Sequence, residues 1–115
     1  MYGSIFDEIE KVTGLPLKLF YTKEIEPCII YELTPVRDDG VTATDRLDFR
    51  IIHLSARDCN RVETQLRKIL LSVGDRPSGD IKNVVISGGG FFPQDETNTV
   101  HKLTFYTITR KSEVM

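Results

Sequence analysis

The sequence predicts an α+β domain, a mostly antiparallel sheet of about four to five strands with two helices packed on one face. Two segments place apolar residues at helical spacing, and several runs are dense in β-branched and aromatic residues. Turn signals join neighbouring strands, which favours antiparallel pairing, and two helices can then cover one face. The 115 residues match one domain, so we expect a single domain spanning residues 1–115.

The composition, 40% apolar and 28% charged, is typical of a globular domain and argues against disorder. The formal net charge of −2 lacks the basic excess of a dedicated nucleic-acid binder. Asp7, Glu8 and Glu10 stand where a signal peptide is basic and then apolar, and no apolar run reaches membrane-spanning length, so we expect a cytoplasmic chain without a membrane partner. In that reducing compartment, Cys28 and Cys59 are interpreted as small core residues.

The first helix is expected over residues 4–13. Its predicted apolar face consists of Ile5, Phe6, Ile9 and Val12. Ser4 is the expected N-terminal cap, and Gly14 followed by Pro16 ends the helix. An extended segment is expected over residues 17–21.

The first main strand is expected over residues 28–33, closed by the Thr34-Pro35 step. Residues 36–44 contain an Asp-Gly step and are interpreted as a long hairpin connection. The next strand is expected over residues 45–54. Its apolar and charged residues alternate, which predicts a packed face of Leu47, Phe49 and Ile51 and a solvated face of Arg46, Asp48 and Arg50.

The second helix is expected to begin after Ser55, which can cap it together with Asp58, and to end at Gly74. Its predicted buried stripe consists of Val62, Leu66, Ile69, Leu70 and Val73. A polar turn, a strand over residues 81–87, a long glycine-rich loop over residues 88–98 and a last strand over residues 99–110 complete the prediction.

The residue chemistry predicts no catalytic, metal-binding or cofactor-binding residues. Gly88 to Gly90 follow a strand, but no helix opens after them, so a phosphate-binding loop is not expected. His53 and His101 lack ligand spacing and are interpreted as strand-end side chains with satisfied hydrogen bonds. Cys59 is expected to be partly exposed in the first turn of the second helix, with a modestly lowered pKa.

Two sets of charges are candidate interaction residues. Four acidic residues are expected in the two long loops: Asp38, Asp39, Asp95 and Glu96. Their ordinary interpretation is solvated loop charge. Three basic residues are expected on the second helix, as a solvated face or the rim of an interface: Arg57, Arg61 and Arg67.

The sequence resembles the tail terminator, or tail completion, proteins of long-tailed bacteriophages and prophages. The resemblance covers nearly the whole chain. It rests on the amphipathic helix leading to Leu15-Pro16-Leu17, the run Pro27-Cys28-Ile29-Ile30-Tyr31, the strand and helix over residues 49–70, and two closing runs, residues 94–97 and 101–105.

This resemblance implies a structural protein without enzymatic activity or a cofactor. Small α+β subunits of that family form a homo-oligomeric ring, typically hexameric, that sits on the last ring of the tail tube and joins it to the head. The implied partners are the tail-tube protein and the head-completion protein, and the implied location is the neck of the virion after assembly in the host cytoplasm. DNA is only passing cargo, so the four acidic loop residues become candidates for the channel or for subunit interfaces.

Two other classes of function remain open. A dimeric ligand-binding or regulatory α+β module would hold the glycine loop over a pocket, and a fixed dimer in solution would distinguish it from a ring. A hydrolase using Cys59 and His101 predicts turnover and sensitivity to thiol reagents.

Overall fold

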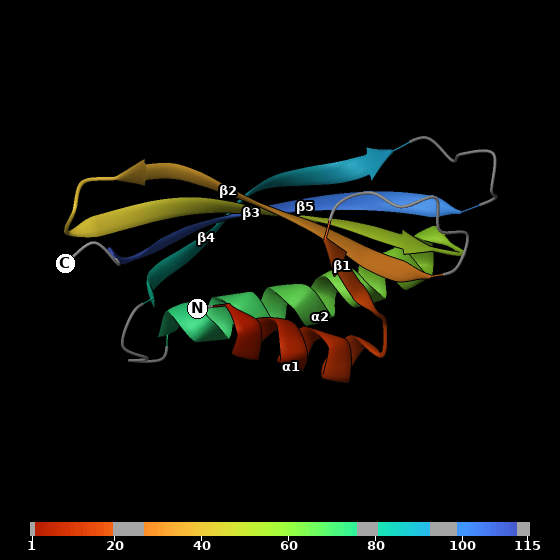
Figure 1. Cartoon of the computed structure of the whole chain (residues 1–115). Coiled ribbons are helices and arrows are strands. Elements are labelled where there is room, and N and C mark those ends of the chain that lie inside the picture. The colour runs from red at the N-terminus through yellow and green to blue at the C-terminus, as the bar shows by residue number, and fades with distance from the viewer. Residues whose placement is uncertain (1, 20–26, 76–80, 93–98, 113–115) are drawn as a thin grey trace.

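The computed structural model describes residues 2–19, 27–75, 81–92 and 99–112 and contains one sheet covered on one face by two helices (Figure 1). The elements follow the order α1 (Gly3–Thr13), β1 (Leu17–Leu19), β2 (Cys28–Asp38), β3 (Thr42–His53), α2 (Ala56–Asp75), β4 (Ile81–Phe92) and β5 (Val100–Lys111). The predicted α+β class, with two helices on one face of a mostly antiparallel sheet, is confirmed.

The five strands lie in the order β1-β2-β3-β5-β4. Three of the pairings are antiparallel, and the short β1 pairs in parallel with the beginning of β2, where Leu17 lies opposite Ile29. β3 is central, with Phe49 opposite Tyr31 of β2 and opposite Thr104 of β5. The sheet therefore has two outer edges, one formed by β4 and the other by β1 and the remainder of β2.

The core lies between the sheet and the helices. The inward residues of β3 are Leu47, Phe49 and Ile51, and each has no exposed surface. They pack with the stripe of α2 formed by Val62, Leu66, Ile69 and Leu70, as the helical spacing predicts; the side chain of Val73, the fifth predicted member, lies outside the described part of the structure. The Phe49 and Tyr106 rings meet edge to face with centroids 6.0 Å apart.

The two helix starts differ in how they are capped. At α2, the Ser55 hydroxyl accepts a hydrogen bond from the Asp58 backbone N–H and donates one to the Asp58 carboxylate, which confirms the predicted cap. At α1, the prediction of Ser4 as the cap is wrong, because the helix begins one residue earlier and Tyr2 occupies the cap position without a side-chain bond. Gly14 ends α1 with a φ of 69°, as predicted.

The predicted apolar face of α1 is wrong at Val12, which is 46% exposed. The buried residues are Ile5, Ile9 and Thr13, which follow one another at intervals of four. The Thr13 hydroxyl bonds the Ile9 carbonyl at 2.6 Å, so a polar residue is buried with its hydrogen bond made.

The first predicted long loop, residues 36–44, is wrong. β2 continues to Asp38 and β3 begins at Thr42, so a tight turn joins them. The strand passes through Pro35 because a register shift between Pro35 and Arg37 accommodates the proline at the sheet edge.

The second predicted long loop, residues 88–98, is wrong for its first five residues, because β4 runs through the three glycines to Phe92. Residues 93–98 lie outside the described part of the chain. At Gly89, an added Cβ would lie 2.6 Å from the Leu103 carbonyl oxygen of β5. Glycine therefore permits a close approach of the two strands rather than a flexible loop.

Candidate assembly surface

The end of the β2–β3 hairpin extends past the two helices (Figure 1). Two valines near its tip are largely uncovered, Val36 with 62% and Val41 with 60% of its surface exposed. We call this end of the hairpin, residues 36–42, the hairpin arm. The arm extends past the helices but remains part of the sheet to its tip, because Thr42 pairs with Lys111 of β5 and the Val41 carbonyl accepts a hydrogen bond from the Ser112 N–H. Its apolar tip is suited to contact with another protein surface.

Asp38 and Asp39 stand in this arm and shape its turn. The Asp38 carboxylate accepts a hydrogen bond from the Gly40 N–H at 2.9 Å, and Asp39 accepts from the N–H groups of Val41 and Thr42 at 2.9 and 2.8 Å. These backbone bonds lower the pKa of each carboxyl below its usual value, chiefly through Gly40 for Asp38 and through Thr42 for Asp39. Both carboxylates therefore stay charged and exposed at the tip of the arm.

Asp95 and Glu96 lie outside the described residues, so the structure does not place them beside Asp38 and Asp39.

The three predicted arginines are exposed on α2. Arg61 lies 3.7 Å from the Asp58 carboxylate, and Arg67 forms an ion pair with Glu63 one turn away. Because α2 follows the far end of β3, Arg57 in its first turn lies at the opposite end of the sheet from the hairpin arm (Figure 1). Within one subunit, the structure does not bring these arginines to the acidic turn.

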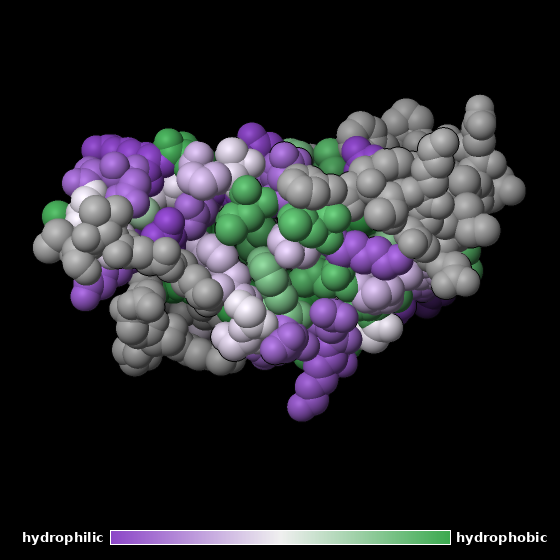
Figure 2. Space-filling model, in the orientation of Figure 1, coloured by the Kyte–Doolittle hydropathy of each residue, from purple (hydrophilic) through white to green (hydrophobic). Residues whose placement is uncertain are grey.

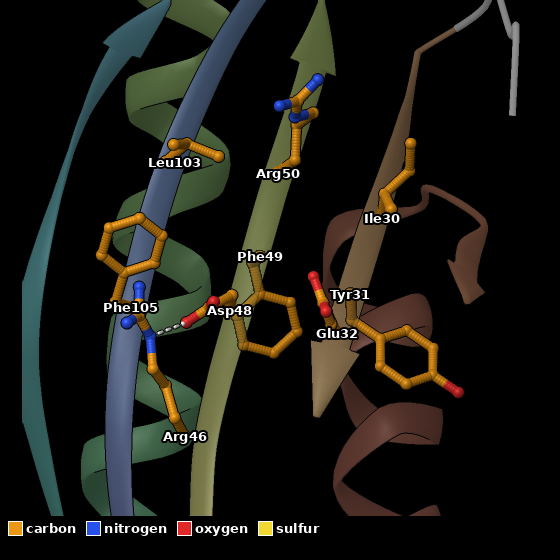
Figure 3. Close-up of a pocket in the computed structure, with 9 residues that line it drawn as sticks. All are labelled: Ile30, Tyr31, Glu32, Arg46, Asp48, Phe49, Arg50, Leu103 and Phe105. Carbon is orange, nitrogen blue, oxygen red and sulfur yellow. Dashed lines mark hydrogen bonds and ion pairs between the residues drawn. The ribbon is translucent and has the colours of Figure 1, made fainter. Parts of the chain in front are cut away.

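The face of the sheet away from the helices is bare in the described structure and carries a shallow depression of about 470 Å³ (Figure 3). Arg46 bonds Asp48 at 2.8 Å and lies over the Phe105 ring, 4.5 Å from its centroid. Glu32 and Leu103 stand beside this group on the neighbouring strands. The alternation predicted this charged face, but only the strand order places Phe105 beneath Arg46.

The side of the molecule on which α1 meets the sheet edge is more apolar. Apolar side chains gather in the middle of this side (Figure 2). The ring centroids of Phe6 on α1 and Tyr31 on β2 lie 4.6 Å apart. Leu33 of β2 is half-buried beside the core. These contacts hold α1 to β2.

The two residues considered for catalysis, Cys59 and His101, are both buried. Cys59 has no exposed surface and contacts the Val100 carbonyl at 3.3 Å, so its predicted partial exposure is wrong. Burial raises the pKa of its thiol, which is the reverse of the expected direction. His101 is buried with its Nε2 3.1 Å from the Thr99 hydroxyl, and His53 Nδ1 accepts from the Leu54 N–H. Each histidine thus has the hydrogen bond that the sequence predicted.

Among the described residues, no three histidine, cysteine or acidic side chains gather in an arrangement able to hold a metal ion. Nor is any helix in this part of the chain both long and apolar enough to cross a membrane.

Comparison with known proteins yields no match to any protein-family model and none to a curated protein. The fold and surfaces therefore define the chain only as an α+β domain with a projecting, partly apolar hairpin arm.

Proposed function

We propose that this chain is a structural protein of a long-tailed phage or prophage, a tail terminator whose copies form a ring, typically of six. The ring would close the tail tube and join it to the head, in contact with the tail-tube and head-completion proteins. This proposal places the chain in the neck of the virion. It rests on the family resemblance of the sequence together with the surfaces of the domain.

The observation that carries the proposal is the hairpin arm. A ring needs each subunit to present one surface to the next subunit and a different surface to the previous one. The arm extends past the helices together with the end of β5, and Val36 and Val41 offer a neighbouring subunit apolar surface. Asp38 and Asp39 between them would then lie at a subunit contact or toward the channel.

The regulatory-module alternative keeps part of the feature that favoured it, because Gly88, Gly89 and Gly90 line a hollow of about 390 Å³ together with Glu63, Arg67 and Lys102. The hollow lies against the strand β4, to which these glycines belong, and not beneath a loop as that alternative expects. The depression on the bare face is partly open to solvent, unlike the enclosed pockets that bury most of a small ligand.

Negative-stain microscopy tests the proposal. The purified chain, alone at high concentration and mixed with headless tail tubes that lack their terminator, should form rings with a central hole or cap the tube ends. A chain that neither forms rings nor binds such tubes contradicts the proposal. Bovine serum albumin mixed with the same tubes is a control for nonspecific binding.

A further inference from the structure

The outer edge of β4 is open. β4 pairs with β5 from Ile81 to Phe92, and no other described strand lies beside it. An edge strand presents backbone N–H and C=O groups that readily pair with another strand, and natural proteins usually protect such edges with charges or proline. β4 contains no proline and one charged residue, Lys82, whose ammonium is turned back across the sheet to the Thr42 hydroxyl at 3.3 Å. Two register shifts interrupt β4, one between Ile81 and Asn83 and one between Ile86 and Gly88. The regular stretch between them contains the β-branched run Val84-Val85-Ile86, in which Val85 is 49% exposed.

The opposite edge of the sheet is protected. β1 covers β2 as far as Tyr31, and the Ile29 N–H donates to the Pro16 carbonyl. Backbone N–H and C=O groups alternate in direction along a strand, so the groups of Leu33 and Pro35 point to the same outer edge as those of Ile29. Pro35 has no N–H to donate at this edge. The register shift after Pro35 interrupts the edge further.

The free end of β2 is also more charged than β4, since it carries Glu32, Arg37 and Asp38. Among the described strands, the regular stretch of β4 is therefore the less protected of the two edges of the sheet. A molecule with one receptive edge forms a closed pair, whereas two receptive edges would produce an open chain of subunits.

We propose that the free chain forms a two-fold dimer in which β4 pairs antiparallel with β4 of a second copy. An antiparallel strand edge is complementary to itself, because its N–H and C=O groups meet the same groups of the rotated copy. The rotation places the two Lys82 residues toward opposite ends of the contact, so the charges do not face each other. The helices of both copies lie on one face of the extended sheet, with α2 of each copy packed against its own β4 beside the contact.

This dimer is independent of the ring proposed above. A two-fold contact closes on itself and cannot pass from subunit to subunit around a ring. It is therefore a form of the free protein, in which each copy covers the edge of the other and leaves the hairpin arm uncovered.

Disulfide cross-linking tests the contact directly. We expect one of the single variants Asn83→Cys, Val85→Cys and Ser87→Cys to form a covalent dimer under mild oxidation, because cross-strand Cβ atoms near a two-fold axis lie within disulfide distance. The native Cys28 and Cys59 are 1% and 0% exposed and should not interfere. Thr34→Cys, on the exposed part of β2, is the matched control and should remain uncross-linked.

A charge placed on the open edge tests the same contact without a covalent bond. At concentrations below those at which rings assemble, light scattering of the unmodified chain should give twice its 13.1 kDa mass. Val85→Lys should weaken the dimer at least about tenfold through like-charge repulsion and edge protection, with an unchanged circular dichroism spectrum. Thr34→Lys, an equal change on the other edge, should leave the mass unchanged.

The outcomes separate this inference from the proposed function. A chain that is monomeric at all concentrations overturns the β4 contact. So does a dimer that Thr34→Lys dissociates and Val85→Lys does not. In either case the ring proposal is still tested by the binding of the chain to tail tubes. A β4-linked dimer that never caps a tube supports the contact and contradicts the tail terminator proposal.

Discussion

The Tyr2 hydroxyl donates a hydrogen bond of 2.5 Å to the Asp45 carboxylate, and both side chains are buried. Arg110 of β5 reaches the same carboxylate at 2.6 Å. Three elements therefore meet at one acid: the start of α1, the central strand β3 and the end of β5. This group fixes α1 against the sheet where the helix has no side-chain cap of its own.

Replacing Tyr2 by phenylalanine should lower the free energy of unfolding by about 1.5 to 3 kcal/mol, the usual contribution of a hydrogen bond to a charged group. Asp45 keeps its ion pair with Arg110, so the fold should survive. Urea denaturation measures the change. A stability equal to that of the unmodified chain would show that this bond contributes nothing net.

The same substitution should alter the alkaline pH dependence of stability. Burial, and then the bond to Asp45, raise the pKa of Tyr2 above its ordinary value of about 10. The unfolded chain therefore loses this proton at lower pH than the folded chain, and stability falls as pH rises above about 10. Tyr2→Phe should reduce that slope in melts at alkaline pH, and an unchanged slope contradicts the assignment.

The Tyr106 hydroxyl is buried without a hydrogen-bond partner among the described residues. An unsatisfied buried hydroxyl costs stability, so Tyr106→Phe should leave the unfolding free energy unchanged or raise it by up to about 1 kcal/mol. The phenylalanine ring retains the edge-to-face contact with Phe49. A decrease of the unfolding free energy by more than about 1 kcal/mol, measured by urea denaturation, would show that this hydroxyl makes a hydrogen bond in the folded chain.

Two glycines of β4 provide a matched pair of variants. Gly89 and Gly90 both have a φ of 158°, but a Cβ at Gly89 would meet the Leu103 carbonyl oxygen at 2.6 Å, whereas nothing lies within 4 Å at Gly90. Gly89→Ala should therefore destabilise the fold by about 1 to 3 kcal/mol more than Gly90→Ala, because the backbone of β4 or β5 must shift to make room for the new Cβ atom. Equal thermal melts for the two variants would contradict the close approach of β4 and β5.

The apolar tip of the hairpin arm should be needed for ring assembly. Val36→Lys with Val41→Lys should abolish rings and tube capping while the melting temperature stays close to that of the unmodified chain, since both side chains are exposed. Val12→Lys, on the exposed side of α1, is the control and should assemble normally. Intact rings from the double variant, seen by negative stain, would remove the arm from the subunit contact.

The acidic residues Asp38, Asp39, Asp95 and Glu96 should act either on DNA or at the subunit contact. Lysines at all four positions should slow DNA ejection if they face the channel, because the wall would then bind phosphate, and should prevent assembly if they lie at an interface. Asparagine or glutamine at the same positions keeps oxygen acceptors for the turn and separates charge from structure. Normal infectivity of the lysine variant in a phage assay would leave these residues as ordinary surface charge.

Much of the fold followed from local patterns. The stripe of α2, the Ser55 cap and the alternation along β3 each depend on residues a few positions apart, and all three were predicted correctly. The errors occurred where a strand continued through residues that favour turns, at Pro35 and at Gly88 to Gly90. There, pairing with a strand distant in sequence outweighed the local preference.

Periodicity within single segments was enough to predict the α+β class, the buried faces of α2 and β3, and the alternating charges of the bare face. The folded domain was needed to show which strands are edges, how far the hairpin arm extends past the helices, and that Tyr2 meets Asp45 across 43 positions of the chain. Contacts of that separation depend on the order of the strands in the sheet. Strand order is set by the packing of the whole domain and leaves no periodic signal in any one segment.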